Sequence, residues 1–181
     1  MSKKQQHNDS ATGFSLVELL VTIGIVSVLM AVATPVIIAW LPNLRLQSDA
    51  RQLVSNLQKA RLEAVKRDQC VGIVFTTVPL PATGGGYKIF LDDGSGMGTA
   101  CNGKRDETIS NADATLIPPL DTITMSRSVS LTAANIGGGT FSFTPRGVIR
   151  GSQSGNIQLK NTKVTYTATV SAAGNIQLSK N

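Results

Sequence analysis

The chain has 181 residues and a formal net charge of +6 at pH 7. This length suggests one domain with accessory segments. The moderate positive charge is compatible with an anionic partner but is not diagnostic of one. The sequence holds one histidine, His7, and no phosphate-binding loop that ends in Gly-Lys-Ser/Thr. The missing loop motif argues against a P-loop ATPase.

The first 13 residues form a short polar segment that carries Lys3 and Lys4. In a secretory signal the cleavage site follows an apolar core, whereas here the apolar run begins directly after Gly13. We therefore expect residues 1–13 to be a leader, and a cut between Gly13 and Phe14 to leave the apolar run on the mature chain. By the positive-inside tendency, the two lysines place the leader in the cytoplasm and the rest beyond the membrane.

The apolar run itself predicts a membrane-spanning helix. It has 21 residues from Phe14 to Thr34, and Glu18 is its only charged residue. A helix of this length is about 31 Å long, which is enough to cross the hydrocarbon core of a bilayer. A carboxylate there costs about 3 kcal/mol, and no Lys or Arg precedes Arg45. The natural partner of Glu18 is therefore the α-amine of Phe14, on the same chain or on a neighbour.

The segment GFSLVELLVTIGIVSVLMAVATP, which begins at Gly13, resembles the class III signal and N-terminal helix of type IV pilins and of the pseudopilins of type II secretion. The resemblance implies cleavage after Gly13 by a prepilin peptidase and N-methylation of Phe14. It also implies that Glu18 directs assembly by meeting the N-terminal amine of an adjacent subunit. The alternative is a plain signal anchor that happens to contain a glutamate.

Beyond the apolar run, Pro35 and Pro42 each remove a backbone hydrogen bond, so we expect them to interrupt and kink the helix. After Leu44 the pattern becomes amphipathic, because apolar residues recur at spacings of four and three. This stripe consists of Leu46, Ala50, Leu53, Leu57, Ala60 and Ala64. The charged residues, Asp49 and Arg61 among them, are expected mostly on the solvated faces. We therefore predict an assembly helix at 14–41, an amphipathic half at 42–69 and a β-rich globular domain at 70–181.

Three further segments narrow the resemblance to the GspH/FimT family of minor pilins and pseudopilins. The first is the passage from the helical run at 60–67 to the strand-like run at 70–75. The others are the glycine-centred segments at 141–147 and 170–178. Residues 79–130 remain largely unmatched. The resemblance implies an α+β pilin fold, in which a long N-terminal helix packs on a mostly antiparallel sheet.

Short alternating apolar segments predict the strands of that sheet. They fall at residues 71–78, 87–91, 123–131, 140–143, 157–159, 164–170 and 176–178. Residues 79–86 and 92–119 are expected to form long exposed loops. The acidic pairs at 92–93 and 106–107 are interpreted as solvated turns, in preference to a calcium loop or a catalytic pair of carboxylates.

Cys70 and Cys101 are the only cysteines of the chain. Because both follow the membrane span, they lie in an oxidising compartment, where a lone pair is more often a disulfide than a metal site. Two buried free thiols are the alternative.

We expect no enzymatic activity and no cofactor. His7 lies in the leader, so the mature chain has no histidine for a catalytic triad or a zinc site. DNA binding is the main alternative function. DNA-binding members of the resembled family carry an arginine-rich last turn of the form Gly-Arg-x-Arg, whereas this sequence has Asn175 and Gln177 there. A substitute patch would have to come from Arg146, Arg150, Lys160 and Lys163.

The sequence therefore predicts a minor pilin or pseudopilin that is anchored in the inner membrane and primes or caps a fibre. Its expected partners are other pilin or pseudopilin subunits and a prepilin peptidase, and its domain would be periplasmic or in a surface fibre. A DNA-binding competence pilin and a membrane-anchored adhesin are the alternatives. The sequence does not distinguish a type IV pilus from a secretion pseudopilus.

Overall fold

The structure is a computed structural model that describes residues 14–93, 99–103 and 122–181. The chain divides into a first unit that ends at Trp40 and a second unit, Leu41–Asn181. The elements are the helix α1 (Leu16–Arg67) and the 3-10 helix η1 (Arg150–Ser152), with eight strands: β1 (Val71–Thr76), β2 (Gly86–Leu91), β3 (Thr122–Thr124), β4 (Ser130–Ala134), β5 (Thr140–Phe143), β6 (Gly155–Lys160), β7 (Thr165–Val170) and β8 (Ile176–Lys180).

Helix α1 continues without a break through Pro35 and Pro42. The expectation that these prolines interrupt the helix is therefore wrong. Each proline lacks a backbone N–H, so one intrahelical hydrogen bond is missing at each position. The hydrogen bonds on both sides remain, and they keep the segment helical.

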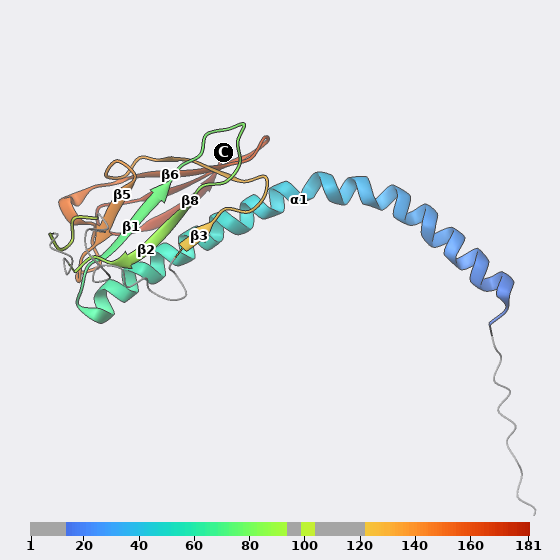
Figure 1. The fold of residues 1–181 in the computed structure, drawn as a ribbon, viewed down its shortest axis with the longest axis horizontal. Coiled ribbons are helices and arrows are strands. Elements are labelled where there is room, and N and C mark those ends of the chain that lie inside the picture. Colours follow the sequence, from blue (N-terminus) through green and yellow to red (C-terminus); the bar gives the residue numbers. More distant parts are fainter. Residues whose placement is uncertain (1–13, 94–98, 104–121) are drawn as a thin grey trace, which may run out of the picture. The chain divides into compact units, whose positions relative to one another are not determined.

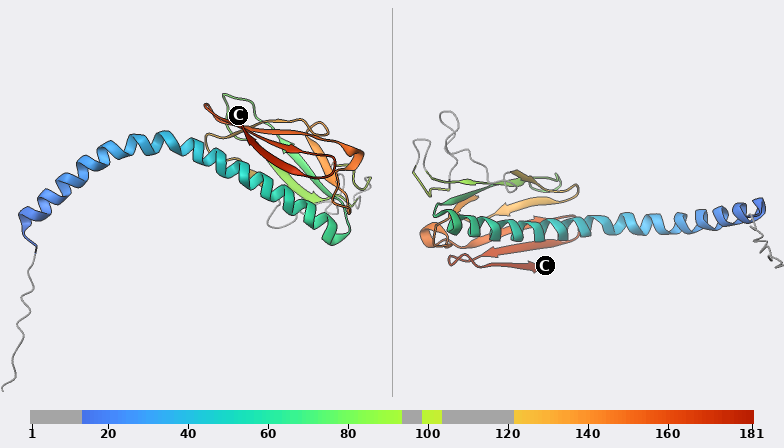
Figure 2. Two further views of the ribbon diagram at one scale, coloured as in Figure 1. Left: turned by 180° about the vertical axis from the view of Figure 1, so that it is seen from behind. Right: turned by 90° about the horizontal axis from the view of Figure 1, so that it is seen from below.

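The second half of α1 packs against the strands (Figures 1 and 2). Its apolar stripe is confirmed, because all six of its residues have no exposed surface: Leu46, Ala50, Leu53, Leu57, Ala60 and Ala64. Burying one leucine side chain contributes about 1.5–3 kcal/mol to stability. The spacing of four and three residues therefore fixes which face of the helix the domain covers.

The strands form two four-stranded antiparallel sheets within the described part of the chain. The orders are β3-β2-β1-β5 and β4-β6-β7-β8. The core joins α1 to both sheets, with side chains such as Leu57, Ile73 and Ile157 in one cluster. The predicted α+β pilin class is confirmed, although the sheet is divided in two where the sequence predicted one.

The predicted strand 123–131 is the main error in the strand assignment. Its first part belongs to β3, which pairs with β2, and its last part belongs to β4, which pairs with β6 in the other sheet. Between them the chain turns at Ser128, which has φ 71°, and the Val129 N–H donates to the Ser126 carbonyl. The apolar alternation continues across this turn, so it does not reveal that the chain changes sheet.

The other strands differ from the predicted ranges only at their ends. Strand β1 stops at Thr76 because the Val78 N–H turns away to the Leu131 carbonyl of β4 (2.8 Å). The predicted loop 79–86 is exposed at residues 81–83, but Gly84 forms a bridge to Ser130 and Gly86 begins β2. This loop is therefore tied to both sheets.

Candidate functional site

The apolar segment Phe14–Trp40 is exposed at every residue. By length and composition its helix can cross a membrane, and among the described residues no other helix can. The exposed fractions of its large side chains are high, for example 84% for Phe14 and 67% for Trp40. A surface this apolar requires cover from a lipid bilayer or from other protein chains.

The hydroxyl groups of this segment are satisfied within the helix. Thr22 Oγ1 donates to the Leu19 carbonyl (2.8 Å), and Ser27 Oγ donates to the Ile23 carbonyl (2.7 Å). Thr34 Oγ1 makes the same kind of bond one helical turn back along the chain (2.6 Å). Polar groups in an apolar medium need internal partners because water is not available. These three side chains therefore suit a lipid or fibre interior, a feature that the sequence analysis did not single out.

Glu18 lies in the first turn of α1. It is the only charged side chain between Phe14 and Leu44. A carboxylate in the first turn interacts favourably with the helix dipole, but it needs a cation if the segment is buried in an assembly. Residues 1–13, the predicted leader with Gly13 and His7, lie outside the described residues, so the leader and the cleavage between Gly13 and Phe14 stay predictions.

Two polar residues on the second half of α1 are buried, contrary to the expectation for Asp49. The Asp49 carboxylate accepts hydrogen bonds from the Ser126 N–H and hydroxyl, both 2.8 Å. Asn56 donates to the Tyr87 hydroxyl at 2.9 Å, and burial raises the pKa of Tyr87 to about 12. Asp49 and Asn56 are seven residues apart, which places both on one flank of the apolar stripe. This seven-residue spacing was the signal in the sequence that could have indicated their shared burial.

Arg61 is also not merely a solvated charge. Its guanidinium donates to the carbonyls of Ala173 (3.2 Å) and Gly174 (3.1 Å), in the turn between β7 and β8. A Cβ at Gly174 would lie 2.4 Å from the Gly147 carbonyl oxygen, so this contact requires a glycine. The two glycine-centred turns that suggested the family therefore meet beside α1.

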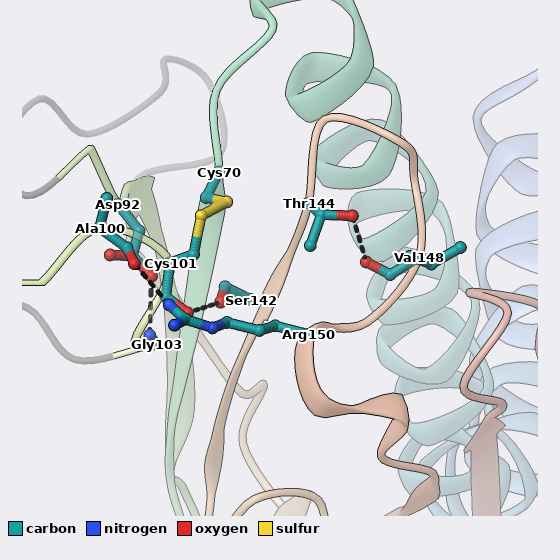
Figure 3. Close-up of a disulfide and its surroundings, with 9 residues drawn as sticks. All are labelled: Cys70, Asp92, Ala100, Cys101, Gly103, Ser142, Thr144, Val148 and Arg150. Carbon is teal, nitrogen blue, oxygen red and sulfur yellow. Dashed lines mark hydrogen bonds between the residues drawn. A yellow bond between two sulfur atoms is a disulfide. The ribbon is translucent and has the colours of Figure 1, made fainter.

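The predicted disulfide between Cys70 and Cys101 is present (Figure 3). It ties the chain just before β1 to the segment 99–103. Around it, the Asp92 N–H donates to the Cys70 carbonyl (2.9 Å) and the Ser142 hydroxyl donates to the Cys101 carbonyl (2.9 Å). One end of the long predicted loop is thus fixed to β1, β2 and β5.

Asp92 is fully buried, so the interpretation of this residue as a solvated turn is wrong. Its carboxylate accepts a hydrogen bond from the Gly103 N–H at 2.7 Å. Burial raises the pKa of Asp92, and the hydrogen bond from the Gly103 N–H opposes that rise. Asp93 is exposed, and residues 106–107 lie outside the described residues.

The four candidate DNA contacts are all exposed but fall into two groups. Arg146 and Arg150 lie between β5 and β6, near the end of β6 that begins at Gly155. Lys160 and Lys163 lie at the other end of β6, where the Asn161 amide donates to Asn43 Oδ1 (2.8 Å). The six residues of β6 span roughly 17 Å. The structure therefore does not gather these four cations into one patch.

Comparison with known proteins gives two family matches. Type II transport protein GspH matches residues 49–174, and the prokaryotic N-terminal methylation motif matches residues 9–34. The pilin-like protein PilA1 of Thermus thermophilus is 42% identical over 82 residues. That alignment covers 44% of this chain and 47% of PilA1, so the chain matches about half the length of this relative.

Two crystal structures of the type IV minor pilin FimU from Pseudomonas aeruginosa are similar to the chain. The alignment with one of them covers 74% of this chain and 91% of the FimU chain, with 20% identity and a TM-score of 0.46. The alignment with the other covers 76% of this chain and 90% of the FimU chain, with 22% identity and a TM-score of 0.48.

The methylation motif, the long helix that follows it and the antiparallel sheets define a type IV pilin-like protein, in the class of minor pilins and pseudopilins. The chain belongs to the family of type II transport protein GspH, whose match covers most of its length. The resemblance to the GspH/FimT family predicted from the sequence is thus confirmed.

Proposed function

We propose that the chain is a minor fibre subunit that primes or caps a type IV pilus or a type II secretion pseudopilus. In this proposal a prepilin peptidase cuts between Gly13 and Phe14, and Phe14 becomes N-methylated. Before assembly the mature subunit is anchored in the inner membrane, with its N-terminus cytoplasmic and its β domain periplasmic. It then moves into a fibre formed with other pilin-type subunits.

The observation that carries this proposal is the exposed apolar segment with Glu18 as its single charge. A plain membrane anchor gains nothing from a carboxylate, which costs about 3 kcal/mol in a bilayer. A subunit that docks on the N-terminal amine of a neighbour does gain from it, because the two charges meet in an apolar fibre core. The internally bonded hydroxyls of Thr22 and Ser27 support burial of the same segment.

In this proposal the globular unit has a structural role. Its buried polar side chains, such as Asp49 and Asn161, join one part of the fold to another. We infer that the domain acts by presenting a rigid surface to neighbouring subunits.

The test combines processing with location. Intact-mass analysis of the protein from cells with a prepilin peptidase should show a chain that starts at methylated Phe14. Immunogold labelling of a tagged chain on sheared fibres should mark fibre ends, and deletion should reduce the number of fibres more than their length. A membrane form that retains Met1, or labelling along the whole fibre, would contradict the proposal.

A further inference from the structure

Three segments that are distant in the sequence enclose a pocket of about 270 Å³ in the second unit. One wall is Cys101 and Asn102, a second is β5 with Thr140 and Ser142, and a third is the η1 region with Arg150 and Gln153. We call this the Arg150 pocket. Its volume is just below the range of about 300–1,000 Å³ that is typical of small-molecule sites. It therefore suits one side chain or a chain terminus better than a cofactor.

The wall formed by residues 99–103 is held firmly. The disulfide fixes Cys101 to the start of β1, and Asp92 accepts the Gly103 N–H. The hydroxyls of Ser142 and Thr140 donate to the carbonyls of Cys101 and Gly103. The pocket therefore has a defined shape that depends on the oxidised cysteines.

Among the residues that the structure describes, Arg150 is the only charged one that lines the pocket. Its side chain reaches from η1 toward Ala100, and its Nη1 donates to the Ala100 carbonyl (Figure 3). A guanidinium has five N–H donors, so one bond to a neutral carbonyl does not saturate it. The hydroxyls of Thr140 and Ser142 already donate their protons to backbone carbonyls, so they cannot donate to an incoming group. The guanidinium has N–H donors left over, and it also carries the positive charge.

The pocket lies at the end of the second unit that is remote from Leu41. From Leu41 to Arg67, α1 covers about 40 Å, and Cys70, directly after the helix, is bonded to the pocket residue Cys101. The hairpin tip at Asn161, by contrast, is bonded to Asn43 near the start of the unit. The pocket and the hairpin tip at Asn161 therefore lie at opposite ends of the second unit.

We propose that the Arg150 pocket receives a carboxylate, an acidic side chain or a C-terminal group, from a neighbouring pilin-type subunit. This inference rests on the proposed function. A guanidinium recognises a carboxylate through two parallel hydrogen bonds, and a single carboxylate fits the volume. A nucleic acid backbone needs several cations along its length, and the described lining of the pocket offers one.

The test is a titration of the isotope-labelled full chain in detergent micelles, followed by NMR. N-acetyl-L-glutamate α-amide, which carries one side-chain carboxylate, is the probe, and N-acetyl-L-glutamine α-amide, which carries none, is the neutral control. The probe should shift the Arg150 Nε–H signal and the backbone amides of residues 101–103 and 150–153 in a saturable way. The control compound should not. Equal shifts with both compounds, or no saturable shift with either, would overturn the proposal.

Matched variants locate the interaction. Arg150→Gln should weaken binding of the probe by about tenfold or more, since a charge-assisted bond is lost. Arg146→Gln removes an exposed charge four residues away, outside the pocket lining, and should leave binding unchanged. Gln153→Glu keeps Arg150 and its bond to Ala100 but adds a negative charge to the lining, so it should also weaken binding of the probe. Wild-type affinity in both pocket variants would refute the assignment.

Two further measurements distinguish a carboxylate pocket from a nucleic-acid contact, and the pocket inference from the proposed function. The first is binding of a short single-stranded DNA. If the DNA binds more tightly than the probe, and both the Arg146 and the Arg150 variant lose this binding equally, the site is a nucleic-acid contact and the proposal is wrong. Recovery of the wild-type chain in sheared fibres tests the proposed function independently. If it is incorporated but does not bind the probe, the pocket inference fails and the proposed function stands. If it is never incorporated, the proposed function fails whatever the titration shows.

Discussion

The carboxylate of Asp49 accepts two hydrogen bonds from Ser126, one from its N–H and one from its hydroxyl. The residues are 77 positions apart, and both distances are 2.8 Å. Asp49 lies on the buried side of α1, and Ser126 lies where the chain leaves β3 to enter β4 in the other sheet. A single side chain of the helix therefore holds the segment that connects the two sheets.

Replacing Asp49 with Ala should lower the free energy of unfolding of the second unit by about 1–3 kcal/mol, because the Ser126 N–H loses its acceptor in a poorly solvated place. Asp49→Asn keeps one acceptor and should cost less. Hydrogen exchange of the full chain in detergent, read on peptides that cover β3 and β4, is the measurement. Lys59→Ala on the exposed face is the control, and equal exchange in the Asp49 and Lys59 variants would contradict the assignment.

Replacing both Cys70 and Cys101 with Ser should destabilise the second unit by about 3 to 4 kcal/mol, because the bridge closes a long loop in the unfolded chain. Local effects should be largest in residues 99–103. Thermal unfolding with and without reductant gives the first quantity, and hydrogen exchange gives the second. Reductant should have no effect on the double variant. Unchanged unfolding of the wild type under reduction would show that the bridge is not structural.

Asp92 predicts a specific dependence of stability on pH. Because burial raises its pKa in the folded chain above the ordinary value of 3.8, the folded state binds this proton more tightly than the unfolded state does. Its contribution to stability is therefore greatest below pH 3.8 and falls as the pH rises through the raised pKa. The Asp92→Asn variant lacks this loss.

The measurement is the difference in unfolding free energy between wild type and Asp92→Asn, followed from pH 3.5 to pH 7. The wild type should lose stability relative to the variant across this interval. Asp68→Asn, at an exposed position after α1, controls for general charge effects. A wild type that gains stability relative to Asp92→Asn as the pH rises would show that hydrogen bonds to the carboxylate outweigh its burial.

The features that the sequence predicted correctly depend on local pattern. The burial of Leu46, Leu53 and Leu57 follows from helical spacing, and the limits of β5 and the position of β7 follow from alternation. The disulfide was predicted from the number of cysteines and from the expected position of both beyond the membrane. The family followed from Gly13, Phe14 and Glu18 at their required spacing and from the glycine-centred turns.

The features that it missed depend on contacts between distant residues. Nothing near Ser126 in the sequence shows that Asp49 will bind it, so the change of sheet after β3 was not predicted. Asp92 looked like a turn because glycines follow it, yet the disulfide and β5 bury it. In the sequence Arg61 resembles its charged neighbours, and only the fold shows that it binds the β7–β8 turn. The separation of Arg146 from Lys163 likewise comes from strand order.

For DNA, we expect weak binding at best, since Asn175 and Gln177 replace the arginines of the family's DNA-binding turn and the four candidate cations are divided between two ends of β6. A gel shift with the full chain in detergent at physiological salt is the measurement. Submicromolar affinity that is lost on changing Arg146 and Arg150 to Ala would favour the competence pilin. A low affinity that changes little in that double variant would agree with scattered surface charge.

The most direct test of assembly through the N-terminal helix is the fate of Glu18 variants. Changing Glu18 to Ala or Gln removes a membrane penalty of about 3 kcal/mol, so membrane abundance should be unchanged or higher. In a fibre, however, the Phe14 amine would be buried without its partner, which costs several kcal/mol. Glu63→Gln, at a half-buried position in the second half of α1 where Glu63 pairs with Arg67, is the control. The measurement is the ratio of tagged chain in sheared fibres to tagged chain in the membrane. We predict a large fall for the Glu18 variants and none for Glu63→Gln, and a wild-type ratio in the Glu18 variants would contradict docking through Glu18.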